Sequence, residues 1–187
     1  MSTATETAVP SIPSGAWSVD PVHSRVEFHV QHNGIAPYRG SFSDYAVRLI
    51  GEDNGSVAVE GSAKVASISG EDENLYGHLQ SPEFFDAEQY PEIKFRSTDV
   101  QLGDAGELTV TGDLTIRDQT KSVEARGKIS GPGPNLGGQN VVAVYLEAVV
   151  DRNEFGLGWN MDLPNGTKVL GDDVTLTVSL ELVEEAN

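Results

Sequence analysis

Residues 173–183, DVTLTVSLELV, alternate apolar and polar side chains over their whole length. Successive side chains of an extended strand point to opposite faces, so the apolar ones share a face. These are Val174, Leu176, Val178, Leu180 and Leu182. The segment SRVEFHVQH at 24–32 repeats the pattern, with Val26, Phe28 and Val30 on one face. Both segments predict half-buried β-strands.

Six further segments show the same two-residue period: 40–50, 56–68, 92–100, 107–116, 121–130 and 140–150. Within residues 40–50, the pattern places Phe42 and Ala46 on the apolar face. Glycine-bearing turns separate most of the segments, which favours antiparallel pairing between neighbours. Closing such strands into a barrel covers the apolar face and removes both sheet edges. We therefore predict an all-β, eight-stranded antiparallel barrel, whose interior admits side chains or one slender ligand.

Two stretches lack this alternation. In residues 71–90, EDENLYGHLQSPEFFDAEQY, Leu75 and Leu79 stand four apart, as on a helix face, and Ser81-Pro82-Glu83 is typical of a helix start. We expect two short helices between strands three and four, and these should pack four apolar side chains against a barrel mouth: Leu75, Leu79, Phe84 and Phe85. Residues 151–171 are rich in apolar side chains and are expected to fold over the opposite rim or into the lumen.

The 187 residues carry 29 acidic and 12 basic side chains, a formal net charge of −17 at pH 7, and no cysteine. This length suits one domain, and we predict a disordered, Pro-punctuated tail at 1–15 before a barrel domain at 16–184. The acid excess disfavours nucleic acid and stable attachment to anionic membranes. The lack of cysteine excludes disulfides, thiolate metal sites and cysteine nucleophiles. A neutral, apolar or cationic partner remains.

The spacing of the polar residues disfavours catalytic and metal sites. His29 and His32 stand three apart on a strand and point to opposite faces, so they do not share a metal ion. Asp20, His23 and Ser24 are the residue types of a hydrolase triad, but neighbours in one strand do not reach its geometry. We predict no enzyme activity, no metal and no required cofactor. The alternation alone leaves open whether the lumen holds an apolar ligand or a packed core.

Five phrases occur in order along the chain: WSVDPVHS at 17–24 with VEFHVQH at 26–32, HLQSPEFFD at 78–86, YPEIKFRST at 90–98, TGDLTI at 111–116 and RNEFG at 152–156. Together they resemble the YceI-like family of polyisoprenoid- or lipid-binding proteins. The resemblance implies a lipocalin-like barrel, commonly a homodimer, whose channel holds a polyprenyl quinone or polyprenyl phosphate. Many such relatives carry a secretory leader. This chain opens without one, so we expect a cytoplasmic protein.

Six residues on the apolar strand faces are expected to line this channel: Phe28, Phe95, Leu114, Leu146, Leu176 and Val178. Headgroup or mouth contacts are expected from His23, His32, Tyr38, Arg152 and Trp159, with capping of rim backbone groups or packing under a loop as their alternative role. The hypothesis is a carrier or reservoir for one isoprenoid lipid that contacts membranes at most transiently. Two alternatives stay open, a redox or stress-response protein that uses a bound quinone and a packed barrel that serves as an interaction module.

Overall fold

The computed structural model describes residues 12, 14–69 and 72–186. Most of the tail predicted at 1–15 lies outside the described residues, whereas Gly15 already belongs to the first strand. No helix in this described part of the chain is long and apolar enough to cross a membrane.

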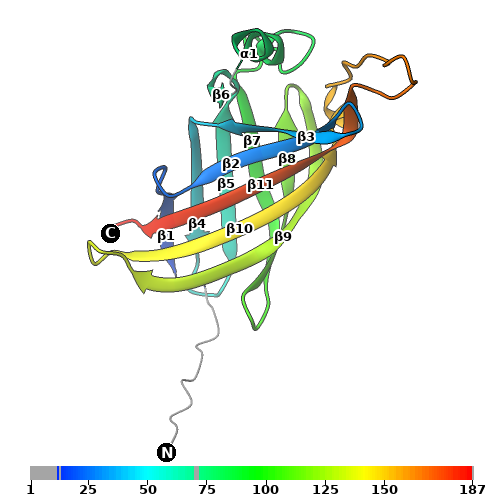
Figure 1. Cartoon of the computed structure of the whole chain (residues 1–187). Helices are drawn as coiled ribbons and strands as arrows, with labels where there is room; N and C mark the ends of the chain where they lie inside the picture. Colours follow the sequence, from blue (N-terminus) through cyan, green and yellow to red (C-terminus); the bar gives the residue numbers. More distant parts are fainter. Residues whose placement is uncertain (1–11, 13, 70–71, 187) are drawn as a thin grey trace, which may run out of the picture.

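Strands dominate the described residues. They are β1 (Gly15–Val19), β2 (Arg25–His32), β3 (Ala36–Phe42), β4 (Tyr45–Gly51), β5 (Val57–Lys64), β6 (Ile68–Ser69), β7 (Glu92–Leu102), β8 (Glu107–Ile116), β9 (Gln119–Pro134), β10 (Asn140–Asp151) and β11 (Leu170–Glu184). The α-helix α1 (Glu73–Gln80) lies above one end of the strands, and short 3₁₀ helices cover Val65–Ser67 and Arg152–Phe155 (Figure 1).

The strands close into one antiparallel ring. Eight of them follow one another around it in the order β1, β4, β5, β7, β8, β9, β10 and β11, and β11 pairs back with β1 from Trp17–Glu184 to Val19–Leu182. The segments β2, β3 and β6 prolong β1, β4 and β5 beyond short breaks, so that β2 pairs with the first half of β11. The predicted all-β, eight-stranded antiparallel barrel is confirmed, with three of its strands broken.

A side chain bridges the break between β1 and β2. Ser24, the last residue of this break, is fully buried. Its hydroxyl accepts a hydrogen bond from the Glu181 amide at 2.9 Å and donates one to the Glu181 carbonyl at 3.4 Å. An unpaired buried backbone group costs about 1–3 kcal/mol. Ser24 therefore keeps the β11 ladder satisfied where the first strand leaves it.

The break at Ser43 and Asp44, between β3 and β4, changes which residues face the lumen. Phe42, at the end of β3, is buried, whereas Ala46 is exposed. Beyond the break the lumen is lined by Tyr45, Val47 and Leu49. The prediction that Phe42 and Ala46 share the apolar face is therefore wrong, because the break shifts the two-residue period by one position.

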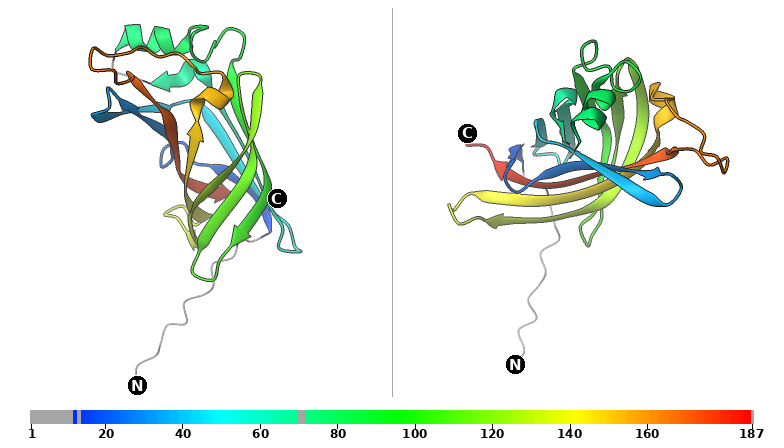
Figure 2. Two further views of the ribbon diagram at one scale, coloured as in Figure 1. Left: turned by 90° about the vertical axis from the view of Figure 1, so that its right-hand side faces the viewer. Right: turned by 45° about the horizontal axis from the view of Figure 1, so that its top comes forward.

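The connection between β6 and β7 and the connection between β10 and β11 lie at the same end of the barrel (Figures 1 and 2). They follow the third and the seventh of its eight strands. One contains α1, and the other runs from residue 152 to 169. Odd-numbered strands of an up-and-down barrel all run in one direction, so both connections leave from one end. Phe155 and Leu157 line the lumen in the same apolar cluster as Phe84. Residues 151–171 thus enter the lumen as expected, but the expectation of the opposite rim is wrong.

One of the two predicted helices forms among the described residues. Helix α1 begins after Asp72, whose carboxylate accepts hydrogen bonds from two first-turn amides at 2.9 Å. From Ser81 onward the chain makes successive turns, and Asp86 has a φ of 50°, through which a right-handed helix does not continue. The prediction of a second helix from Ser81 onward is therefore wrong. Three of the four side chains expected at the mouth are buried there: Leu79, Phe84 and Phe85.

Two inward phenylalanines lie over glycines of a neighbouring strand. Phe28 on β2 pairs with Gly40 on β3, and a Cβ atom at Gly40 would lie 2.4 Å from the Phe28 ring. Phe95 on β7 covers Gly112 on β8, where the corresponding distance is 2.5 Å. The missing Cβ atoms leave both rings room along the barrel wall.

We predict that Gly40→Ala destabilises the fold by about 1–3 kcal/mol, because the added methyl group forces the Phe28 ring out of its rotamer. Urea unfolding monitored by circular dichroism measures this cost. The same substitution in a Phe28→Leu background should cost less, because the shorter side chain leaves space for the methyl group.

Gly61→Ala is the matched control, since Gly61 also lies in a strand on the cavity wall and a Cβ atom there would be 3.8 Å from its nearest neighbours. It should be neutral or stabilise by about 0.5–1 kcal/mol. Equal effects of the two substitutions would contradict the contact between Phe28 and Gly40.

Candidate functional site

A cavity of about 430 Å³ lies inside the barrel. Its wall includes residues from two apolar clusters of the core, one near α1 around Phe42 and Ile116, the other near the chain ends around Leu49 and Leu182. Phe95 packs against both clusters, which makes the lining continuous along the barrel. The volume lies within the range of about 300–1,000 Å³ that is usual for small-molecule sites.

All six predicted channel residues lie on the cavity wall: Phe28, Phe95, Leu114, Leu146, Leu176 and Val178. Three neighbouring strands each place one residue at the same level of the cavity wall. Ala148 on β10 pairs with Leu176 on β11, and Leu176 pairs with Phe28 on β2. Ala148 leaves space at this level, because its side chain ends at Cβ. The space at this level therefore depends on one small residue beside two large ones.

Three rings close the end of the cavity below α1. The ring centroid of His78 lies 4.8 Å from that of Trp159 and 4.9 Å from that of Phe84, both in T-shaped contact. The His78 Nε2 atom lies 2.8 Å from a carboxylate oxygen of Glu83, which fixes the imidazole plane. The connections after the third and seventh strands thus meet in one aromatic cover over the lumen.

His78 was not among the residues expected at this mouth from the sequence. The signal was present, because His78 stands three residues after Leu75 and so lies on the same helix face. Its contact with Trp159 joins residues 81 positions apart, which local spacing does not reveal.

Beside this cover, one edge of the sheet lacks a partner strand. Strand β3 pairs with β2 along its whole length, but its other edge pairs with β6 only at Ser41 and Phe42 among the described residues. Residues 36–40 therefore form a free edge, and Tyr38 lies on it with its side chain on the cavity wall. The Tyr38 hydroxyl is buried and has no hydrogen-bond partner within the described part of the protein. Burial raises the pKa of this hydroxyl, which keeps it a neutral donor.

Arg152 also lies on the wall, but its three shortest hydrogen bonds go to backbone carbonyls. Its side chain is 4% exposed and donates to the carbonyls of Gly171 at 2.8 Å, of Trp159 at 2.9 Å and of Leu157. Asp172 lies 3.5 Å away and opposes the desolvation that lowers the pKa of the guanidinium. Arg152 therefore holds residues 157–171 over the barrel. This matches the alternative role considered for it, packing under a loop, and not a headgroup contact.

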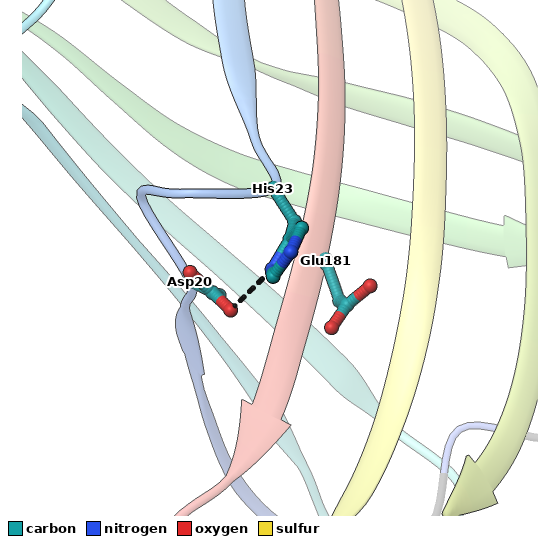
Figure 3. A group of neighbouring side chains, drawn as sticks. All are labelled: Asp20, His23 and Glu181. Atoms are coloured by element: carbon teal, nitrogen blue, oxygen red, sulfur yellow. Dashed lines mark hydrogen bonds and ion pairs between the residues drawn. The ribbon is translucent and has the colours of Figure 1, made fainter. Parts of the chain in front are cut away.

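The other expected headgroup residues divide between inside and outside. His32 and Trp159 line the cavity near the free edge and the aromatic cover. His23 does not: it lies exposed on the outer surface, at the break between β1 and β2 (Figure 3). The expectation that His23 faces a mouth fails because Ser24 takes the buried position in this break.

His23 belongs instead to a polar group with Asp20 and Glu181, in which one imidazole nitrogen and one oxygen of each carboxylate lie within 4.8 Å of one another (Figure 3). The Asp20 carboxylate accepts from the Val22 amide at 2.8 Å and lies 2.8 Å from His23 Nδ1. This hydrogen bond raises the pKa of His23 and lowers that of Asp20. The pair closes the turn that carries the chain across the break.

Comparisons with known proteins agree with the barrel. The profile of the YceI-like domain matches residues 17–182. A UPF0312 protein of Staphylococcus epidermidis is 27% identical over 168 residues, and one of Staphylococcus aureus is 29% identical over 171 residues. Each match covers 88% of this chain and 95% of the relative.

Two solved structures show the same fold. BcnA of Burkholderia cenocepacia is similar with a TM-score of 0.75 at 20% identity, over 87% of this chain and 98% of its own. A polyisoprenoid binding domain from Saccharophagus degradans, implicated in plant cell wall breakdown, is similar with a TM-score of 0.64 at 10% identity, over 90% and 98%.

We predict that the bond between His23 and Asp20 makes stability depend on pH. The raised pKa of His23 means that its contribution is complete below the unfolded value of about 6.5 and is lost as pH rises through the folded value. The Asp20 contribution is complete above about pH 3.9 and is lost as pH falls through its lowered pKa. The pair is therefore most stabilising between about pH 4 and 6.5.

Urea midpoints of the wild type and of His23→Gln between pH 5.5 and 8.5 measure this. The difference between the two proteins should shrink as pH rises, and His29→Gln, on the outer face of β2, controls for loss of a surface histidine. A difference that stays constant across this range would rule out the bond.

Proposed function

The chain belongs to the YceI-like family, and from this premise we propose that it binds one isoprenoid lipid in the barrel cavity and carries or stores it. The observation that carries the proposal is the apolar cavity of about 430 Å³ that extends between both clusters of the core. A structural neighbour is a polyisoprenoid binding domain, which supports a ligand of this class. The cavity also counts against a fully packed barrel that serves as an interaction module.

The energetics favour an exchange of lipid over its irreversible capture. Moving one five-carbon isoprene unit from water into the lumen is worth about 4 kcal/mol, at roughly 0.8 kcal/mol per carbon. A lipid taken from a membrane is already in hydrocarbon, so this term nearly cancels. The fit of the chain to the wall and the contacts of its polar end then decide which lipid is bound.

The polar end is proposed to lie beside Tyr38. Its hydroxyl offers a donor inside an apolar wall, and the Phe28 ring lies 6.3 Å from the Tyr38 ring, close enough for both to contact one planar group. Arg152, the guanidinium buried in the wall, already donates to three carbonyls. A neutral acceptor therefore fits this place better than a phosphate, which favours a polyprenyl quinone over a polyprenyl phosphate.

A binding role without catalysis agrees with the chemistry of the wall. Most inward side chains of the strands are apolar, and the raised pKa of Tyr38 keeps its hydroxyl protonated and makes it a weak acid. We propose that a quinone is bound here as cargo. Mass spectrometry of a solvent extract of the purified protein identifies it directly, and a protein that carries no isoprenoid and takes up none would overturn the proposal.

We predict that Ala148→Phe weakens uptake of a polyprenyl quinone at least about tenfold. The added ring fills the level formed with Leu176 and Phe28, and even one methylene in an apolar pocket changes affinity by about 10- to 200-fold. Quenching of intrinsic tryptophan fluorescence by the quinone measures the affinity.

Ala143→Phe is the matched control, because Ala143 lies on the same strand but is exposed on the outer face. It should leave the affinity unchanged. Circular dichroism and urea unfolding confirm that both variants form the barrel, and equal affinities of the two would place the ligand outside the lumen.

We predict that Tyr38→Phe weakens quinone binding by about 2- to 12-fold, since a hydrogen bond of this kind contributes about 0.5–1.5 kcal/mol. Binding of squalene, an isoprenoid without a polar end, should not change. The ligand-free variant should be at least as stable as the wild type, because the buried hydroxyl has no partner there. Parallel losses for quinone and squalene would show that Tyr38 shapes the wall and does not bind the polar end.

A further inference from the structure

Two large apolar side chains stand exposed on neighbouring segments at the end of the barrel that carries α1. Ile35, at the turn between β2 and β3, is 86% exposed, and Met161, in the connection after β10, is 58% exposed. These two segments lie next to each other in both views of Figure 2 and in Figure 1. We call them together the tip patch, residues 33–37 and 160–169.

Backbone hydrogen bonds hold the two halves of the tip patch in place. The Asn33 amide donates to the Val169 carbonyl at 2.7 Å. The Asn160 side chain bonds to both backbone groups of Leu170, at 2.7 and 3.0 Å, which closes the second half into a small hairpin. These bonds give both segments a defined conformation, so Ile35 and Met161 occupy fixed positions on the surface.

The charge of the tip patch departs from that of the whole chain. The protein carries a net charge of −17, yet residues 28–43 contain no Asp or Glu. In the second half, Asp162 forms an ion pair with Lys168 at 2.7 Å and is thereby balanced. Acidic side chains lie outside it, for example at Glu52 and Asp53 in the turn between β4 and β5 and at Asp172 and Asp173 just after its second half.

The tip patch adjoins the cavity. Tyr38, Val169 and Leu170, at its borders, all line the cavity wall. The free edge of β3 also lies here, from residue 36 to residue 40. Apolar side chains, the absence of excess negative charge and the unpaired edge of β3 thus occur at one place.

We propose that the tip patch docks on the surface of a lipid bilayer, with Ile35 and Met161 entering its hydrocarbon boundary. Exposed apolar groups on an acid-poor surface fit a lipid surface, whereas the acidic remainder of the protein keeps the contact reversible. The docking gives an isoprenoid a path into the lumen that avoids water. Only this last step rests on the proposed function.

The lack of cysteine permits a direct test. Met161→Cys, labelled with an environment-sensitive fluorophore such as NBD, reports insertion into phosphatidylcholine vesicles by a blue shift and increased emission. Leu136→Cys, labelled in the same way, is the matched control, because Leu136 is equally apolar and fully exposed but lies at the turn between β9 and β10, at the other end of the barrel. We expect a shift at residue 161 and none at residue 136.

Ile35→Ser in the labelled Met161→Cys protein should lower the affinity for vesicles, measured from this shift, at least about tenfold. Fully burying one such side chain is worth more than a tenfold change in an equilibrium constant. Equal shifts at both labelled positions, or no shift at either, would overturn the docking. A shift at residue 161 that appears on raising the protein concentration without vesicles would also overturn it, since the patch would then meet a second copy of this chain.

Delivery of the quinone separates this inference from the proposed function. The variant Ile35→Ser with Met161→Ser should take up quinone from vesicles about tenfold more slowly than the wild type, while binding it equally well from detergent solution. Leu136→Ser should behave as the wild type in both. Failure of the wild type to bind quinone from detergent would refute the proposed cargo and leave the vesicle test of docking valid. Equal rates of uptake from vesicles in all three proteins would refute the docking path.

Discussion

The backbone ladder between β11 and the broken first strand closes the barrel, and every other feature depends on this closure. Because β11 pairs with β2 along its first half and with β1 at its end, the last strand contacts the first over nearly its whole length. Ser24 keeps the ladder satisfied where the chain steps aside. Once the ring is closed, the two-residue period sends half of the strand side chains into one shared lumen.

The lumen stays partly empty because of how its large and small residues are paired across strands. Phe28 lies over Gly40 and Phe95 over Gly112, so the rings lie along the wall. Ala148 faces Leu176 at the level of Phe28 and adds little volume. A barrel of eight strands has room for side chains or for one slender ligand, and these pairings favour the ligand.

The two ends of the barrel differ in chemistry, and this difference gives the cavity a direction. One end carries α1, the aromatic cover around His78 and the connection that Arg152 holds down through three carbonyls. The free edge of β3 and the tip patch lie at the same end. A lipid that entered there would meet Tyr38 at the border and apolar side chains beyond it.

The strand number, the antiparallel order and the inward face of residues 24–32 and 173–183 could be predicted from the alternation of apolar and polar residues, because side chains of a strand repeat every two residues. The alternation therefore identified Phe28, Leu176 and Val178 as wall residues. The shift of period at Ser43, the outer position of His23 and the role of Arg152 became evident only in the folded barrel. Each of these depends on tertiary contacts, such as those of Ser24 with Glu181 and of Arg152 with Gly171, and local periodicity carries no information about such contacts. The empty space in the lumen has the same origin, since it depends on which glycine faces which ring across the sheet.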